Sequence, residues 1–182
     1  KGRMPSTRMG NLAVNRQTWI AAQEYKRKVD AGERVTRDLA METLAGVLSG
    51  DRLIHNHCYR ADEVAIVIDM GKEFGYKVSA FHHAVEAYKI GDMLAREGIC
   101  SAIWADWYGF KMEAYDAIPE NAAILHKRGA CIVIHSDDEN QIQRLNQEAA
   151  KAQADARRAG VDIPDAEVIR WITFNPAKAM GI

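Results

Sequence analysis

The chain has 182 residues, of which 48% are hydrophobic and 27% charged, as in ordinary soluble globular proteins. Its formal net charge is −1, with 24 basic and 25 acidic residues, so no overall field attracts a phosphate backbone or an anionic membrane surface. We therefore expect neither nucleic acid nor a membrane as a partner. The three cysteines, Cys58, Cys100 and Cys131, are widely spaced, and we expect reduced thiols rather than a disulfide framework or a zinc knuckle.

The sequence leaves the cellular compartment open. No apolar stretch is long enough to span a bilayer, and residues 1–20 lack the apolar core of a signal peptide. A cytoplasmic protein fits this pattern, and so does a secreted or periplasmic one whose signal peptide preceded Lys1.

Two helices are expected ahead of the first strand. Residues 1–10 are rich in Gly, Arg, Pro and Ser and indicate a loop, whereas 16–29 has the pattern of a helix. Thr36 is expected to cap a second helix, whose apolar residues recur at near-helical spacing until Gly50 ends it.

Four β-α units follow, with strands expected at 53–57, 78–81, 99–104 and 131–135 and helices at 61–74, 86–97, 119–127 and 141–159. This alternation favours an α/β fold with parallel strands covered by helices. It fits either an open sheet or an arc of a (β/α)8 TIM-type barrel. A further helix is expected from Asp165, and Asn175 and Pro176 are expected to supply the cap and first turn of a short final helix.

Side chains of metal-binding type gather at the ends of these strands: His55, His57, His82, His83, Asp106, His135 and Asp137. In parallel α/β folds, functional groups collect at the C-terminal ends of strands. Any single histidine there is more often a half-buried polar residue. Their repetition at successive strand ends favours a metal site, because converging imidazoles and carboxylates suit a catalytic divalent ion and repel or desolvate one another without it.

Four segments resemble the last four strands and closing helix of the amidohydrolase superfamily, nearest its imidazolonepropionase-like branch. They are HCYRADE at 57–63, FHHA at 81–84, HSD at 135–137 and NPAKAMGI at 175–182. The resemblance extends from about Arg16 onward and implies the fifth to eighth strands of a TIM-type barrel. It places metal ligands at His57, His83 and Asp137, with His83 and Asp137 also catalytic.

Two rival ligands remain, His55 and His82. Strand alternation puts His55 on the same face as His57, one layer deeper, and points His82 away from His83. We expect His55 and His135 to be packing or second-layer groups.

The resemblance also indicates what this sequence lacks. The superfamily's first strand ends in a His-x-His pair and its fourth often supplies a Lys or Glu. No His-x-His pair precedes the two expected leading helices, and His55-Asn56-His57 comes too late in the sequence to be that pair. We therefore expect 1–182 to be a partial catalytic barrel without the N-terminal half-barrel and β-sandwich, a fragment that is inactive alone. The missing half of the enzyme is its expected partner, and the intact enzyme is expected to be a homo-oligomer.

The implied reaction is hydrolysis of an amide-like C–N bond with one or two divalent ions, Zn2+ first among them. Asp137 would move the proton, and His83 would bind a second ion or polarise the carbonyl. The expected substrate is a small molecule or dipeptide, with cyclic amides included. Five residues on or near the loops after the strands are weaker candidates for holding it: Arg60, Trp107, Tyr108, Lys111 and Arg144.

A second hypothesis treats the chain as a non-catalytic metal-binding or scaffolding half-barrel that oligomerises. It predicts a homodimer with two equivalent sites, each made from His57, His83 and Asp137.

Overall fold

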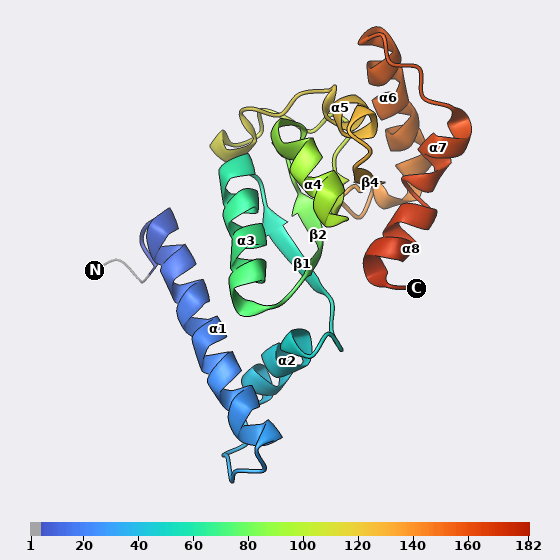
Figure 1. Cartoon of the computed structure of the whole chain (residues 1–182). Coiled ribbons are helices and arrows are strands. Elements are labelled where there is room, and N and C mark those ends of the chain that lie inside the picture. Colours follow the sequence, from blue (N-terminus) through green and yellow to red (C-terminus); the bar gives the residue numbers. More distant parts are fainter. Residues whose placement is uncertain (1–4) are drawn as a thin grey trace. The chain divides into compact units, whose positions relative to one another are not determined.

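The computed structural model describes residues 5–182, which divide into a helical unit (5–53 and 68–77) and an α/β unit (54–67 and 78–182) (Figure 1). In the helical unit, α1 spans Arg8–Asp30 and α2 spans Leu39–Leu48. The helix expected over 16–29 is confirmed and begins earlier, because the Thr7 side chain accepts a hydrogen bond from the backbone N–H of Gly10. The loop expected over 1–10 is therefore wrong from Arg8 onward, and residues 1–4 lie outside the described residues.

The cap of α2 differs from the one expected. Asp38, not Thr36, precedes the helix, and its carboxylate accepts hydrogen bonds from Ala40 N and Met41 N at 2.9 and 3.1 Å. An Asp directly before the first helical residue reaches two of the unpaired N–H groups of the first turn, which Thr36 lies too far back to reach.

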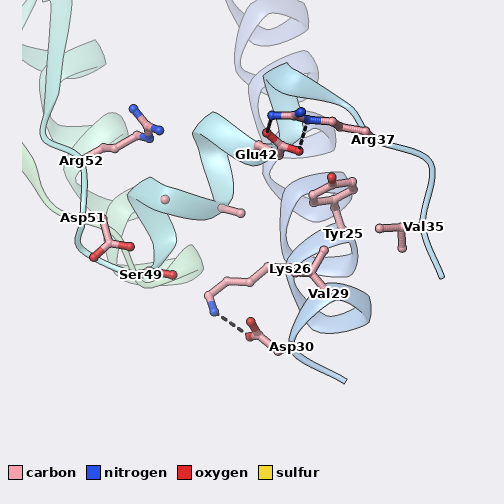
Figure 2. A pocket seen from close by; sticks show the side chains of 12 residues that line it. Tyr25, Lys26, Val29, Asp30, Val35, Arg37, Glu42, Ser49, Asp51 and Arg52 are labelled. Carbon is pink, nitrogen blue, oxygen red and sulfur yellow. Dashed lines mark hydrogen bonds and ion pairs between the residues drawn. The ribbon is translucent and has the colours of Figure 1, made fainter. Parts of the chain in front are cut away.

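The helical unit has its own apolar contacts and a cavity of about 820 Å³ (Figure 2). The rings of Trp19 and Tyr76 stack at 4.2 Å. Ion pairs form within the cavity wall between Lys26 and Asp30 at 2.6 Å and between Arg37 and Glu42 at 2.9 Å. These four charges are satisfied without a ligand.

The α/β unit contains a four-stranded parallel sheet in the order β1-β2-β3-β4, with strands Ile54–Cys58, Val78–His83, Cys100–Ile103 and Cys131–Ile134. The α/β fold with parallel strands is thereby confirmed. The α-helices that follow the strands are α3 (Ala61–Phe74), α4 (Gly91–Glu97), α5 (Asn121–Lys127) and α6 (Leu145–Arg158). Short 3-10 helices at Ala87–Ile90, Met112–Ala114 and Ile142–Arg144 precede α4, α5 and α6. Within residues 5–182, β1 and β4 each pair with a neighbouring strand on one side.

Two more helices, α7 (Asp165–Arg170) and α8 (Phe174–Met180), complete the unit. The start expected at Asp165 is confirmed, but Asn175 is not the cap of α8, because the helix begins one residue before it. Its amide instead donates to the carbonyl of Ile132 at 2.7 Å and ties α8 to β4. Across residues 5–182, no helix is long and apolar enough to cross a membrane.

One cysteine expectation is wrong, since Cys100 and Cys131 form a disulfide. They are register partners on β3 and β4, and their Cα atoms are 4.4 Å apart, within the range that a disulfide bridges. Their separation in the sequence carries no sign of this pairing, which depends on the strand register. Cys58 remains a buried free thiol, and burial raises its pKa to about 12.

Candidate active site

Five histidine rings gather at the strands of the α/β unit, as the convergence of parallel strand ends requires. The ring centroids of His57 and His83 are 4.4 Å apart, and those of His83 and His135 are 5.2 Å apart. His55 and His82 form a second close pair at 5.2 Å, and His82 lies 6.2 Å from His135. The structure thus joins groups from the ends of β1, β2 and β4 in one cluster, which we call the histidine cluster.

His82 and His83 do not point away from each other, contrary to strand alternation. His82 pairs in register with His57, on the face expected for a group beside the β1 histidines. His83 has a positive φ of 72° and Ala84 one of 39°, so the backbone leaves the extended conformation at His83. The two rings are 6.4 Å apart and both lie near His135.

Two aromatic side chains enclose His83. Trp104 stacks on its ring at 4.5 Å with an interplanar angle of 24°, and Tyr59 stacks at 5.1 Å with the same angle. Trp104 is itself fixed by a hydrogen bond from its indole N–H to the carbonyl of Ser136 at 2.9 Å. Neither Tyr59 nor Trp104 was predicted as a site residue from the sequence, although each is an aromatic residue directly after a strand.

Burial keeps the imidazoles of His83 and His135 neutral. Desolvation, and then the neighbouring His57, lower the pKa of His83 to about 4. Desolvation, and then His83, lower the pKa of His135 to about 3. Within residues 5–182, the buried His83 Nδ1 and His135 Nε2 have no hydrogen-bond partner. Neutral rings with unpartnered nitrogens can coordinate a cation or donate to a substrate.

His135 is therefore more than the packing group expected from its place two residues before Asp137. Its ring is in the histidine cluster, and its unpartnered nitrogen makes it a candidate ligand alongside His57 and His83. Strand alternation put His135 on the same interior face as Asp137 but one layer deeper, so its ring was expected behind the ligands and not beside His83.

His55 makes the contacts of an orienting group. Its Nε2 lies 2.9 Å from the carbonyl of Ala179 and its Nδ1 lies 3.0 Å from His82 Nε2. Because a carbonyl only accepts, Nε2 of His55 is the donor, and in a neutral ring Nδ1 then accepts from His82. Desolvation lowers the pKa of His82, which favours its neutral form. Because His82 Nε2 then carries the hydrogen donated to His55, the lone pair of the His82 ring is on Nδ1.

Asp137 follows β4 in a left-handed conformation with φ 54° and is exposed. Its charge opposes the lowering of the pKa of both His82 and His83, so it acts on the histidine cluster. The neighbouring Asp138, not Asp137, accepts from Asn140 N and Gln141 N at 2.9 and 2.8 Å. Capping of the following turn is thus the work of Asp138, and no hydrogen bond or ion pair within residues 5–182 occupies the Asp137 carboxylate.

The weaker substrate candidates fall into two groups. Trp107 stacks on Trp104 at 5.5 Å, and Lys111 Nζ lies 4.1 Å from the centre of the Tyr59 ring, so both adjoin the aromatic residues around His83. Tyr108 in the same loop is 51% exposed.

The other group consists of Arg60 and Arg144, which within residues 5–182 make no hydrogen bond or ion pair with the histidine cluster. The guanidinium of Arg60 makes two hydrogen bonds to Asp62, at 3.0 and 2.9 Å, and Arg144 is an exposed residue of a 3-10 helix. Asp106 at the end of β3 pairs with Lys151 at 3.1 Å.

The donor set suits a divalent ion, but only in part. Two buried imidazole nitrogens without partners and a nearby exposed carboxylate are ligands that zinc accepts. Across residues 5–182, however, no three His, Cys, Asp or Glu side chains are grouped so that they could hold a metal ion. His57, His83 and Asp137 therefore do not form a complete site as they stand.

No family model matches the chain, but two amidohydrolases are similar to it. "Amidohydrolase tasK" of Hapsidospora irregularis is 28% identical over 195 residues, covering 98% of this chain and 19% of that protein. The crystal structure of an amidohydrolase from Thermotoga maritima MSB8 superposes with a TM-score of 0.82 at 30% identity, covering 97% of this chain and 46% of that one.

This chain is similar to amidohydrolases. The similarity spans nearly all of it but less than half the length of either relative. It supports an amidohydrolase family for the chain and the α/β fold with a parallel sheet, and it does not distinguish the imidazolonepropionase-like branch.

Proposed function

We propose that this chain supplies the second half of the active site of a metal-dependent amidohydrolase of the imidazolonepropionase-like branch, which hydrolyses an amide-like C–N bond. In this proposal the sheet is an arc of a (β/α)8 barrel, with β1 to β4 in the places of the fifth to eighth strands. The observation that carries the proposal is the histidine cluster. His57, His83 and His135 meet with their buried members neutral, and the charge of Asp137 acts on them.

His57, His83 and Asp137 would hold the metal, with His135 as a further candidate. A divalent ion such as Zn2+, when bound there, supplies a lowered pKa for its water ligand and polarises a carbonyl. Because the described residues do not complete a site, the remaining ligands would come from strands outside this chain. The missing N-terminal half of the barrel is then the partner that the site requires, in an enzyme that we expect to form a homo-oligomer.

Asp137 is the proposed proton carrier. Its carboxylate is exposed and is not used to cap the following turn, so it can accept a proton from the attacking water and deliver it to the leaving nitrogen. A neutral His83 can donate to or polarise the substrate carbonyl without adding a charge to the buried site.

The expected substrate is a cyclic amide or a dipeptide. Trp107, stacked on Trp104, offers an aromatic surface beside His83, and Lys111, which pairs with Glu113 at 3.4 Å, places a cation next to the Tyr59 ring. Arg60 is a weaker candidate because Asp62 already occupies its guanidinium.

The experiment is performed on the full-length polypeptide that contains this sequence. Zinc content and hydrolysis of a panel of cyclic amides and dipeptides are measured before and after chelation. Activity lost with the metal and restored by Zn2+ supports the proposal. Hydrolysis that is unchanged after complete chelation contradicts the metal-dependent mechanism. The control variant is Asp106→Asn, which changes a carboxylate that follows β3 and pairs with Lys151, and it should keep the wild-type activity.

The alternative function, a non-catalytic scaffolding module, is supported by the two edges of the sheet. Within residues 5–182, β1 and β4 each pair with a strand on one side and leave the other side unpaired. Unpaired edges favour association with another strand. If the native protein were a dimer of 20.3 kDa chains that binds metal and hydrolyses nothing in the panel, this alternative would replace the enzyme.

A further inference from the structure

The turn that follows β2 has an uncommon backbone. His83 and Ala84 both have positive φ, at 72° and 39°, and neither is a glycine. Residues with a Cβ rarely adopt this conformation, and it persists only where surrounding contacts hold it. This backbone turns the His83 ring toward His57, so whatever holds the turn also sets the position of His83.

Asn121, the first residue of α5, makes the contacts that hold this turn. Its side-chain Nδ2 donates to the carbonyl of Ala84 at 3.3 Å and to the carbonyl of Val85 at 3.2 Å. Asn121 is 5% exposed, so water does not compete for these bonds. The amide places Nδ2 toward these carbonyls, since a flipped amide would set its oxygen against two carbonyl oxygens, and its buried Oδ1 has no hydrogen-bond partner within residues 5–182.

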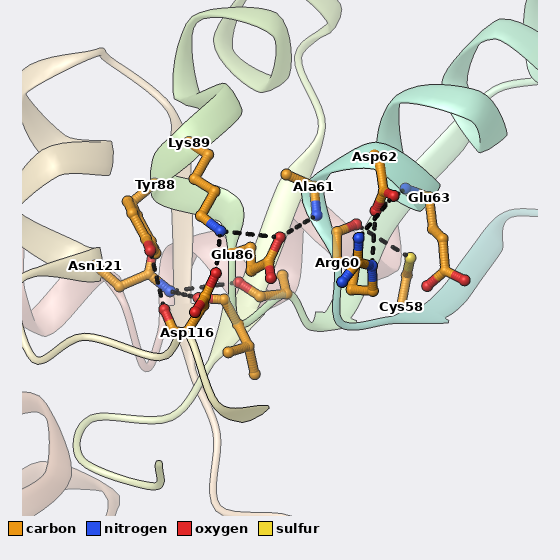
Figure 3. Close-up of polar contacts among 12 residues, drawn as sticks. Cys58, Arg60, Ala61, Asp62, Glu63, Glu86, Tyr88, Lys89, Asp116 and Asn121 are labelled. Carbon is orange, nitrogen blue, oxygen red and sulfur yellow. Dashed lines mark hydrogen bonds and ion pairs between the residues drawn. The ribbon is translucent and has the colours of Figure 1, made fainter. Parts of the chain in front are cut away.

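The rest of the turn is attached to the end of β1 by backbone hydrogen bonds. Ala84 N donates to the carbonyl of Cys58 at 2.9 Å, and Glu86 N donates to the carbonyl of Tyr59 at 3.0 Å. The buried Glu86 carboxylate accepts from Ala61 N at 3.0 Å (Figure 3). These bonds align the turn with β1, whereas Asn121 is, within residues 5–182, the side chain that donates to the carbonyls of Ala84 and Val85.

We propose that Asn121 is a positioning residue for His83: its two hydrogen bonds hold the left-handed turn at 83–84 and so keep the His83 ring against His57 and Trp104. The proposal rests on the proposed function only for the role of His83 and stands on this chain's contacts for the rest. Asn is suited to the task because its amide has two N–H donors for two carbonyl acceptors. Asp at this position would have none and would place a negative charge against both carbonyls.

The test measures ring contacts in the 182-residue chain by NMR, without metal. In the wild type, nuclear Overhauser effects between the His57 and His83 rings and between His83 and Trp104 are expected from their separations of 4.4 and 4.5 Å. Asn121→Ala and Asn121→Asp should lose both effects, while contacts between His55 and His82 should remain. Ala84→Gly should restore them in the Asn121→Ala background, since glycine adopts positive φ without a Cβ cost.

Asn175→Ala is the matched control. Asn175 also donates its amide to a backbone carbonyl, that of Ile132, and among the described residues its side chain makes no hydrogen bond to the turn at 83–85. It should lower the melting temperature without changing the His83 ring contacts. Unchanged His83 contacts in Asn121→Ala, with a loss of melting temperature like that of Asn175→Ala, would overturn the proposal. If Asn121→Ala does not fold, Asn121→Asp, which keeps the size of the side chain but has no N–H donor, decides: lost His83 contacts support the proposal and retained contacts overturn it.

A second readout separates this inference from the proposed function. In the full-length polypeptide, Asn121→Ala should weaken zinc binding by about 10- to 100-fold, the scale for residues that orient metal ligands. A wild type that binds no zinc would contradict the proposed function and leave the NMR result to decide the role of Asn121.

Discussion

At one end of the sheet Cys100 and Cys131 are joined, and the Ser79 hydroxyl and the His55 ring both bond to the carbonyl of Ala179, at 2.5 and 2.9 Å. At the other end, within residues 5–182, the buried His83 Nδ1 and His135 Nε2 have no partner, and His83 and Asp137 have positive φ. Uncompensated polar groups and uncommon backbone both cost stability. Ser101 Oγ, next to Cys100, is also buried without a partner, but the non-glycine residues with positive φ within residues 5–182, His83, Ala84 and Asp137, all lie at the second end. This difference in backbone indicates that the first end holds the sheet together and the second is shaped for chemistry.

The largest expected effect is on catalysis, from Asp137→Asn in the full-length enzyme. Asn keeps the shape of the side chain but cannot accept the proton of the attacking water, so kcat should fall by about 100- to 10,000-fold. Steady-state kinetics with zinc content measured in parallel test this. Asp138→Asn is the control, since Asn caps nearly as well as Asp and should leave kcat near the wild-type value. A wild-type kcat in Asp137→Asn with metal retained would remove Asp137 from the mechanism.

The next largest effect is on stability, at the end of the sheet that holds the Cys100–Cys131 disulfide. Removing the disulfide with Cys100→Ala/Cys131→Ala should lower the free energy of unfolding by about 2–4 kcal/mol, because the unfolded chain regains the freedom of the closed loop. Urea unfolding with and without reductant measures this, and the double variant should not respond to reductant. The NMR contacts of His83 should be unchanged. An equal stability of oxidised and reduced wild type would contradict the stabilising role given to this end.

A smaller effect distinguishes the two histidines of β1. His55→Ala removes the bond to the Ala179 carbonyl and should cost about 1 kcal/mol of stability, with zinc binding retained. His57→Ala should weaken zinc binding by at least about tenfold while changing stability less. Isothermal titration of zinc into both variants tests the assignment. Loss of zinc binding in His55→Ala together with normal binding in His57→Ala would show that the metal ligand on β1 is His55 and not His57.

The smallest effect is on pH dependence. Burial holds the pKa of His83 at about 4 and of His135 at about 3, below the value of about 6.5 that both regain on unfolding. Below about pH 6.5 the unfolded chain therefore binds protons that the folded chain does not, and stability should fall as the pH is lowered toward 4. Melting temperatures across this range should fall less steeply in His135→Gln. Equal slopes in the two proteins would contradict a depressed pKa at His135.

The local features of the fold could be predicted from the sequence. The apolar period of α3 gave its bounds, Ala61–Phe74, and the start of α7 at Asp165 was also predicted. Both depend on residues close together in the chain. The four strands were found for the same reason, each a short apolar run between turn residues.

Features that depend on residues far apart were missed. Asn175 bonds to Ile132, 43 positions earlier, and so does not cap its own helix. The Cys100–Cys131 disulfide required the register of β3 and β4.

The same limit applies to the candidate site. Strand alternation located His57 and His83 at neighbouring strand ends, but it gave His82 and His83 opposite directions. That expectation failed because it assumed an extended backbone, whereas His83 has φ 72°. The conformation is held by Asn121, 38 positions later, and no local pattern around His83 announces it.

The sequential strand order has a consequence for how the protein is made. Each strand pairs with the one synthesised just before it, so the sheet can grow strand by strand as the chain leaves the ribosome. Cys100 can form its disulfide with Cys131 only after β4 has been made. His55 and Ser79, among the first sheet residues to be made, share the carbonyl of Ala179, which is made 124 residues after His55 and 100 residues after Ser79. Until α8 is made, the nascent sheet carries these two side chains without their native partner.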